Sequence, residues 1–153
     1  MYTKNQIIES SLQIQKKAEI IFDAIVDPNN MKNYFISESN GRMESGRTLQ
    51  WKFPEFDEQF EVRVKEIESP SFISFEWDEK DKAYRVEIKI KPFDDQSCVV
   101  HISESSCDDE SIDIEKIKRN TGGWANFLAC MKAYIEFGIN LRKGSFDYYK
   151  GKI

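Results

Sequence analysis

Hydrophobic and polar residues alternate along several short stretches of the chain. In residues 8–14, the apolar side of the alternation carries Ile8, Leu12 and Ile14. A period of two residues is that of a β-strand with one face buried. Gly, Pro, Asn, Asp and Ser stand in the short connections, so we expect antiparallel neighbours. Similar patterns predict five more strands, at residues 49–53, 60–64, 73–77, 84–90 and 97–105.

Three short helical segments and one long helix are expected around these strands. Apolar residues at helical spacing predict a first helix at residues 18–26, which an Asp-Pro pair ends. A second helical turn follows at residues 29–35. After the last strand, an acidic stretch precedes a short helix at residues 112–119. The long helix follows it, within residues 121–138.

The apolar face of this long helix is wider than the stripe of an ordinary surface helix. One row of apolar residues lies at positions 124, 127, 128, 131 and 135, and a second row at positions 127, 130, 134, 137 and 141. Such a face is covered on more than one side. We therefore predict an α+β fold in which a curved antiparallel sheet wraps around the C-terminal helix. A chain of 153 residues, 40% of them hydrophobic, is sufficient for a single domain spanning residues 1–153.

The charge of the chain and its N-terminal sequence narrow the expected partners. A net charge of −5 disfavours binding to nucleic acid, whose phosphate backbone is negative. No apolar stretch is long enough for a membrane span, and residues 1–6 show no signal-peptide pattern. We expect a cytoplasmic protein whose three cysteines are free thiols.

Few residues suggest a chemical reaction. The single histidine, His101, falls on the opposite face of its strand from Cys98, which argues against a Cys–His pair. The spacing of His, Cys and carboxylate residues matches no metal-binding pattern. Residues 121–123 either bind an anion at the start of the long helix or, as we favour, give that helix a tight entry beside the sheet. We predict no catalytic residue, no metal and no cofactor.

The inward faces of the strands carry one carboxylate and many aromatic rings. Glu104 has the parity of Val100 and Ile102, so it points inward unless the strand frays or bulges there. An inward carboxylate needs a partner or a raised pKa, and it would be a polar anchor within an apolar pocket. The inward rings suit either a filled core or a cavity for an apolar or ring-shaped ligand. They are Trp51, Phe53, Phe60, Phe75, Trp77 and Tyr84.

A family resemblance favours the cavity. It is carried by short apolar motifs spread over nearly the whole chain, at residues 18–28, 34–35, 46–53 and 102–105, and above all by Gly123-Trp124 followed by Leu128, Met131 and Ile135-Glu136. Together with the order of elements, they resemble the helix-grip (START-like) fold of the SRPBCC superfamily. Within it, the chain is most similar to the family homologous to the C-terminal domain of the activator of the heat-shock protein 90 (Hsp90) ATPase.

The resemblance implies a deep cavity between the sheet and the last helix, which the superfamily uses for lipids, polyketides, hormones and other hydrophobic compounds. It places Tyr34 and Phe35 near the mouth, and Glu104 where family members often carry an acid. The tail, residues 142–153, is expected to pack over the helix end. The implied ligand-binding residues are Tyr34, Phe35, Trp51, Phe53, Phe75, Trp77, Tyr84, Val86, Glu104, Trp124, Phe127 and Met131.

Three functions are compatible with these observations. The first is a single-domain protein that binds a small hydrophobic molecule in the cavity. The second is an interaction module associated with a chaperone, Hsp90. The third is a cyclase-like or hydrolase-like enzyme, in which Glu104 or a tyrosine moves protons while the cavity orients the substrate. The chain places no second acid, base or nucleophile, so we favour the binding protein.

Overall fold

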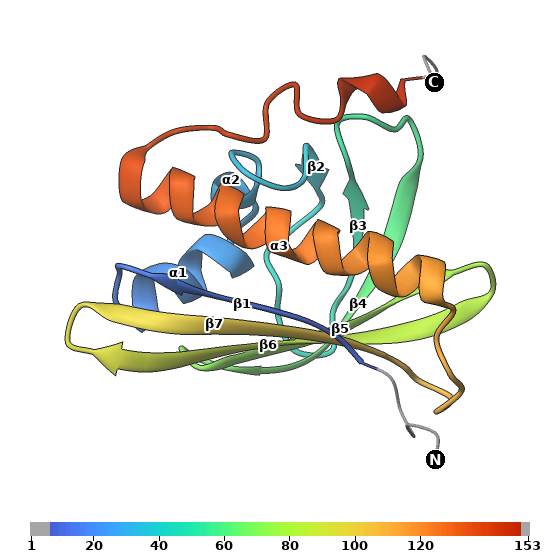
Figure 1. The fold of residues 1–153 in the computed structure, drawn as a ribbon, viewed down its shortest axis with the longest axis horizontal. Helices are drawn as coiled ribbons and strands as arrows, with labels where there is room; N and C mark the ends of the chain where they lie inside the picture. The colour runs from blue at the N-terminus through green and yellow to red at the C-terminus, as the bar shows by residue number, and fades with distance from the viewer. Residues whose placement is uncertain (1–6, 151–153) are drawn as a thin grey trace.

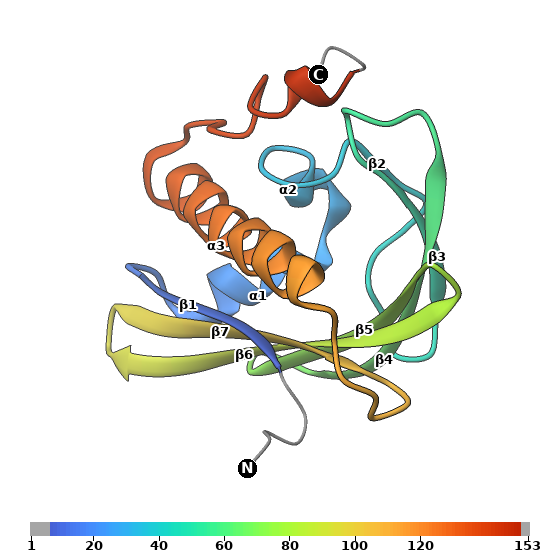
Figure 2. The ribbon, with the colours of Figure 1, turned by 45° about the vertical axis from the view of Figure 1, so that its right-hand side comes forward.

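A computed structural model describes residues 7–150 as one antiparallel sheet curved around a long helix (Figure 1, Figure 2). Residues 1–6, where we expect no signal sequence, and residues 151–153, the end of the expected tail, lie outside the described part. The sheet has seven strands in the order β1-β7-β6-β5-β4-β3-β2. Their bounds are Ile8–Ile14 (β1), Glu38–Ser39 (β2), Thr48–Lys52 (β3), Gln59–Glu68 (β4), Phe72–Glu79 (β5), Lys82–Asp94 (β6) and Ser97–Ser106 (β7).

All six predicted strands are confirmed, and the alternation that predicts them is visible in their burial. In β7, Cys98, Val100 and Ile102 are buried, whereas Val99 and His101 are only partly covered. The expectation that His101 faces away from the core is therefore confirmed. Strand β2 was not foreseen, because two residues are too short to show any period.

The helices are α1 (Ala18–Val26), α2 (Pro28–Met31) and α3 (Ile114–Phe137), with a short 3-10 helix, η1, at Asp147–Tyr149. The first two come directly after β1, and α3 lies in the concave face of the sheet (Figure 2). The α+β helix-grip architecture is thus confirmed. The helical turn expected to reach residue 35 is shorter than predicted, since α2 ends at Met31.

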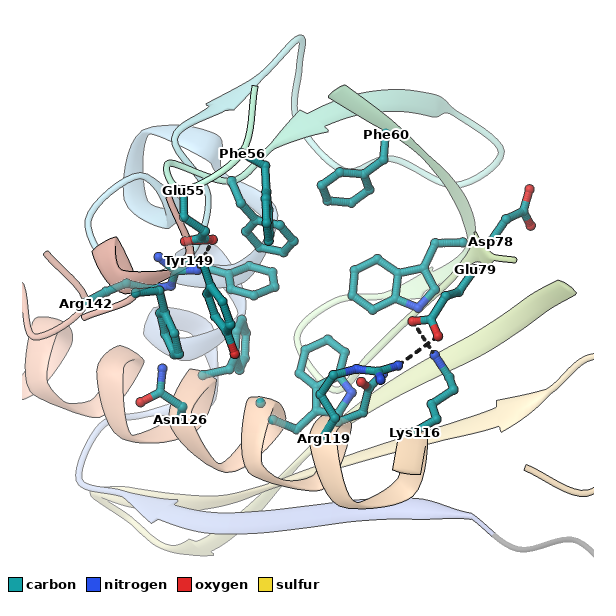
Figure 3. Close-up of a pocket in the computed structure, with 18 residues that line it drawn as sticks. Glu55, Phe56, Phe60, Asp78, Glu79, Lys116, Arg119, Asn126, Arg142 and Tyr149 are labelled. Atoms are coloured by element: carbon teal, nitrogen blue, oxygen red, sulfur yellow. Dashed lines mark hydrogen bonds and ion pairs between the residues drawn. The ribbon is translucent and has the colours of Figure 1, made fainter. Parts of the chain in front are cut away.

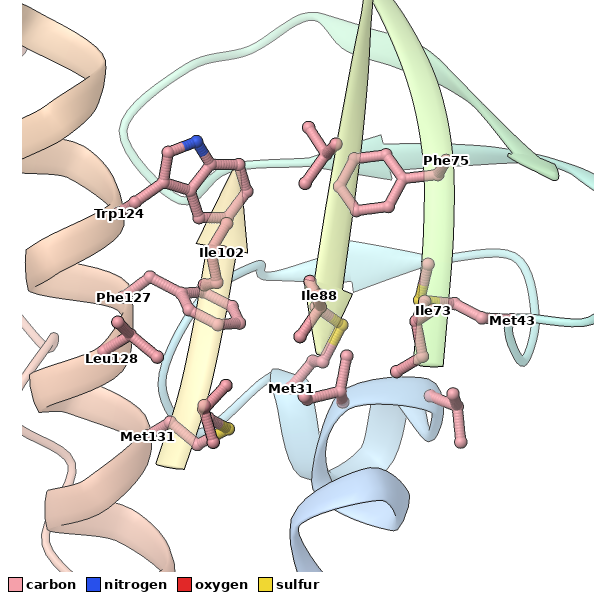
Figure 4. Close-up of a cluster of buried hydrophobic side chains, with 14 of the residues drawn as sticks. Met31, Met43, Ile73, Phe75, Ile88, Ile102, Trp124, Phe127, Leu128 and Met131 are labelled. Atoms are coloured by element: carbon pink, nitrogen blue, oxygen red, sulfur yellow. The ribbon is translucent and has the colours of Figure 1, made fainter. Parts of the chain in front are cut away.

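The long helix packs closely on one edge of the sheet, at strand β1. Its backbone and side chains hydrogen-bond to β1: Ser10 Oγ donates to the Thr121 carbonyl over 3.1 Å, and Lys132 Nζ donates to the Gln13 carbonyl over 3.0 Å. Beneath it, aromatic and aliphatic side chains from both layers fill the space (Figure 4), among them Ile88, Ile102, Phe127, Leu128 and Met131. The far end of the sheet, at β3 to β5, curves upward beside the helix (Figure 2).

The start of α3 differs from both expectations. The helix begins at Ile114, where the Asp113 side chain caps it by accepting from the Glu115 N–H. The separate short helix at 112–119 and the helix entry at residues 121–123 are both wrong, because one continuous helix runs through them. Gly122 and Gly123 lie inside it, although glycine lowers helix stability. Packing of the flanking turns against the sheet overrides that local preference.

Gly122→Ala is expected to stabilise the protein by about 0.5–1 kcal/mol, since alanine is the better helix former and an added Cβ meets nothing within 4 Å. Urea unfolding at pH 7 measures this. Gly138→Ala is the contrasting variant: Gly138 ends α3 with φ at +69°, so a side chain there is strained and stability should fall. Equal effects of the two substitutions would contradict this account.

Candidate functional site

A pocket of about 480 Å³ lies between α3, the β3 to β5 end of the sheet and the chain that follows α3 (Figure 3). It exists because α3 packs towards β1 and leaves the upturned end of the sheet without a second helix to cover it. Half of its lining residues are aromatic: Phe35, Phe53, Phe56, Phe60, Trp77, Trp124, Phe127, Phe146 and Tyr149. The others are polar or small: Glu55, Asp78, Glu79, Lys116, Arg119, Asn120, Gly123, Asn126 and Arg142.

Two stacked indole rings form the floor of the pocket. The rings of Trp77, from β5, and Trp124, from α3, lie 5.6 Å apart at an interplanar angle of 25°. Phe127 meets the Trp124 ring edge-on at 5.3 Å, and Phe35 meets Phe127 at 4.7 Å. Such edge-to-face contacts fix ring orientations as well as contributing burial.

Glu104 fixes both indole rings of the floor through hydrogen bonds on the side away from the pocket. Its Oε2 accepts from Trp77 Nε1, and its Oε1 accepts from Trp124 Nε1 and from Asn120 Nδ2, each over 2.9 Å. Lys116 Nζ lies 3.7 Å from Oε2. The side chain is fully buried, so the strand neither frays nor turns it outward. Both carboxylate oxygens accept hydrogen bonds from the protein itself, and Glu104 does not line the pocket.

A cluster of three charged groups forms one end of the pocket. Glu79 accepts from Lys116 Nζ at 3.1 Å and from Arg119 Nη2 at 2.8 Å (Figure 3). The Lys116 ammonium also lies 3.9 Å from the centre of the Tyr84 ring. Partial burial alone would raise the pKa of Glu79, but the two cations outweigh it and hold that pKa below its ordinary value.

The opposite end is closed by the segment that follows α3, residues 139–150, which we call the roof segment. Arg142 Nη2 donates to Glu55 Oε2, in the β3–β4 connection, over 2.9 Å. The Arg142 guanidinium lies 4.8 Å from the Phe146 ring centre, and Phe146 stacks on Tyr149 at 5.6 Å. The predicted tail therefore reaches beyond the helix end and covers the pocket, with residues 151–153 outside the described part.

The structure divides the predicted ligand-binding set. Five of its members line the pocket: Phe35, Phe53, Trp77, Trp124 and Phe127. Tyr34 lines a neighbouring pocket on the other side of Arg142 and Phe146. Six members lie in the core and not on the pocket wall: Trp51, Phe75, Tyr84, Val86, Glu104 and Met131. They do face inward, but α3 and neighbouring side chains cover them. Whether any member contacts a ligand stays a prediction.

Sequence reasoning missed the pocket residues at the two ends. Glu55 and Phe56 lie in a connection, Arg142 and Tyr149 in the roof segment, and neither segment has a hydrophobic period. Lys116 falls in the expected helix at residues 112–119, which the sequence pattern does not connect with the sheet. The available signal was the clustering of aromatic residues after the end of α3.

The remaining reactive groups lie away from the pocket. His101 contacts Ser11 and Glu9 on the outer face of the sheet, whereas Cys98 is buried on the inner face. Burial raises the pKa of the Tyr34 hydroxyl, which donates to the Ala24 carbonyl over 2.7 Å. Within residues 7–150, no three His, Cys, Asp or Glu residues gather as a metal site would require. No described helix has the length and apolarity to cross a membrane.

A helix-grip domain with an aromatic pocket beside its long helix is the class that the geometry defines. The family model described as "Activator of Hsp90 ATPase homolog 1-like protein" matches residues 15–136, and the chain belongs to this family. The match ends before the roof segment. No curated protein matches the chain.

Solved structures share the fold over most of their length. A protein from Staphylococcus saprophyticus is 25% identical, with a TM-score of 0.75 and coverage of 90% of this chain and 96% of that one. The Aha1 dimer from Colwellia psychrerythraea is 17% identical, with a TM-score of 0.73 and coverage of 87% and 98%. Truncated norcoclaurine synthase from Thalictrum flavum is also 17% identical, with a TM-score of 0.63 and coverage of 87% and 94%.

Glu104→Gln is expected to lower the free energy of unfolding by about 2–4 kcal/mol. The new side-chain NH2 group would point a donor at another donor, either an indole N–H or the Asn120 amide. The negative charge beside Lys116 would also be lost. Urea unfolding measures the loss. Glu87→Gln, on the partly exposed side of β6, is the control and should stay within about 0.5 kcal/mol. A neutral Glu104→Gln would contradict the structural role.

Glu79→Gln tests the charged end of the pocket. Because the pKa of Glu79 in the folded protein lies below its ordinary value of 4.5, its stabilising effect is present above pH 4.5 and is lost as the pH falls through the lower, folded value. The variant should therefore be less stable than the parent at pH 7, by about 1 kcal/mol, because Glu79 and Arg119 are partly exposed to solvent although Lys116 is buried, and the gap should close towards pH 3. Urea unfolding at both pH values measures it, and a gap independent of pH would refute the ionic account.

Proposed function

We propose that this protein binds a small, largely apolar molecule in the pocket between α3, β3 to β5 and the roof segment. The observation that carries the proposal is the pocket itself: much of the concave face is filled by buried side chains, yet about 480 Å³ remains beside α3. That volume lies in the range of roughly 300–1,000 Å³ typical of small-molecule sites.

The chemistry of the pocket walls supports an apolar guest. Both indole N–H groups of the floor are bonded to Glu104, so the Trp77 and Trp124 rings can offer a ligand only their carbon edges and faces. Flat aromatic surfaces of this kind favour planar rings. The charges on the wall balance as three acids against three bases: Glu55, Asp78 and Glu79 against Lys116, Arg119 and Arg142. A balanced wall favours a neutral molecule over an ion.

The same geometry favours binding over turnover. Glu104, the acid that a cyclase-like mechanism would use, has both oxygens occupied and lies behind the floor. Tyr34 has a raised pKa and donates to a backbone carbonyl, so it is a poor proton acceptor. Norcoclaurine synthase shows that the fold is compatible with an enzyme, but at 17% identity the likeness concerns the fold alone. These observations support a carrier or sequestering role.

The test compares two neighbouring glycines of α3. Gly123 lines the pocket and Gly122 does not, and a Cβ at either position meets nothing within 4 Å. Gly123→Leu should fill the pocket and weaken binding of the neutral fluorescent probe N-phenyl-1-naphthylamine at least about tenfold. Gly122→Leu should leave the affinity within about twofold, because its side chain points elsewhere on the same helix. Fluorescence titration measures both.

Equal binding of the probe by the two leucine variants would place it outside the pocket. Absence of probe binding to the parent protein would remove the proposed function itself. Native mass spectrometry of protein purified from its own source complements the titration, since a retained small molecule would identify the ligand.

A chaperone-associated role is the second candidate, and it is supported by the family description alone. If it holds, the protein stimulates the ATPase of Hsp90 from the same organism, and Gly123→Leu leaves that stimulation unchanged because the interaction uses the outer surface. No stimulation at equimolar protein would remove this candidate.

A further inference from the structure

The Glu55 carboxylate carries the one buried side-chain nitrogen or oxygen atom of the described residues that has no hydrogen-bond partner. Its side chain is 5% exposed, and it lines the pocket beside Arg142 (Figure 3). Oε2 accepts from Arg142 Nη2, whereas Oε1 is buried and has no hydrogen-bond partner. An unsatisfied acceptor of this kind costs about 1–3 kcal/mol, and such a group calls for an explanation.

Glu55 is held firmly in this position. The Arg142 side chain is only 11% exposed, and its guanidinium lies 5.6 Å from the Phe53 ring centre and 4.8 Å from that of Phe146. Packed between two rings, the Arg142 guanidinium engages one oxygen of the Glu55 carboxylate in a charge-assisted hydrogen bond. The second oxygen, Oε1, is left buried and without a partner.

We propose that Glu55 is the specificity-determining residue of the pocket, and that the ligand is a neutral aromatic molecule that donates a hydrogen bond, from a hydroxyl or an N–H, to Oε1. This inference rests on the proposed binding function and adds the chemical class of the ligand. Oε1 is buried in the structure, and the soft terminal torsion of the carboxyl group allows this oxygen to turn towards a donor in the pocket that Glu55 lines.

The charge of the pair selects among ligands. Arg142 already neutralises Glu55, so a cationic ligand would bring an uncompensated charge into an apolar site. An anionic ligand would meet the free oxygen of a carboxylate, which repels it. A neutral donor satisfies Oε1 without changing the charge balance, and a ligand that lacks a donor leaves Oε1 unpaired.

The experiment uses three probes of similar shape: naphthalene, 2-naphthol and 2-methoxynaphthalene. Their inhibition constants are measured by displacement of N-phenyl-1-naphthylamine. The parent protein should bind 2-naphthol about tenfold or more tightly than 2-methoxynaphthalene, which accepts a hydrogen bond but cannot donate one. A pocket that sorts ligands by apolarity alone gives the opposite order, because 2-naphthol is the most polar of the three.

Glu55→Gln should abolish this preference. With its carbonyl oxygen turned to Arg142, the new amide presents N–H groups where Oε1 was, so the ratio of the two inhibition constants should fall at least about tenfold. Glu58→Gln is the matched control, because Glu58 is an exposed residue of the same connection and does not line the pocket. It should preserve the preference. Circular dichroism checks that each variant is folded.

The outcomes separate the two proposals. Binding of all three probes by the parent protein without preference for 2-naphthol overturns the role of Glu55, whether or not Glu55→Gln folds, and leaves the binding function intact. A preference that survives Glu55→Gln overturns it as well. If N-phenyl-1-naphthylamine does not bind to the parent protein, both proposals fall.

Discussion

The arrangement of this molecule depends on one buried carboxylate. Glu104, on β7, receives hydrogen bonds from Trp77 on β5 and from Trp124 and Asn120 on α3, so it joins the sheet to the helix at the point where they begin to diverge. Bonds to a charged acceptor are stronger than neutral ones, and in a buried site they tolerate little displacement. Because both indole N–H groups point to the same carboxylate, the two rings stack. The floor of the pocket is therefore a by-product of the contact that docks the helix, and it is formed before any ligand arrives.

Much of the fold could be predicted from residue patterns, and much less of the site. Alternation located six strands and assigned Glu104 and His101 to opposite faces, since a strand has a fixed period of two. The start of α3 was misplaced because adjacent glycines suggest a terminus, whereas tertiary packing carried the helix through them. The alternation could not distinguish Trp77, which lines the pocket, from Trp51 or Phe75, which lie in the core. It predicts on which face of the sheet a side chain lies, but not which other side chains cover that face.

The contact between Glu55 and Arg142 could not be predicted from the sequence. These residues are 87 positions apart and lie outside the periodic segments, so only the folded chain brings them together.

The two ends of the pocket have different origins in the chain. Its floor and its charged end belong to the segment that matches the family, residues 15–136, and depend on contacts with the shared sheet and helix. Its roof lies beyond that match and is attached to the β3–β4 connection chiefly through Arg142 and a small stack of aromatic rings. The apolar platform and Glu55 thus lie within the segment that matches the family, whereas Arg142, which holds Glu55 in place, lies beyond it.

The modest attachment of the roof segment has a kinetic consequence. Its cover over the pocket consists of one ion pair and rings that are partly exposed, such as those of Phe56 and Tyr149. Segments held in this way open locally at a far smaller free energy than the unfolding of the whole domain. A guest can then enter and leave while the sheet and α3 remain packed. Under the proposed binding function, opening of the roof segment would help to set the residence time of a guest, so affinity and release rate could change through the last described residues of the chain without any change in the stability of the core.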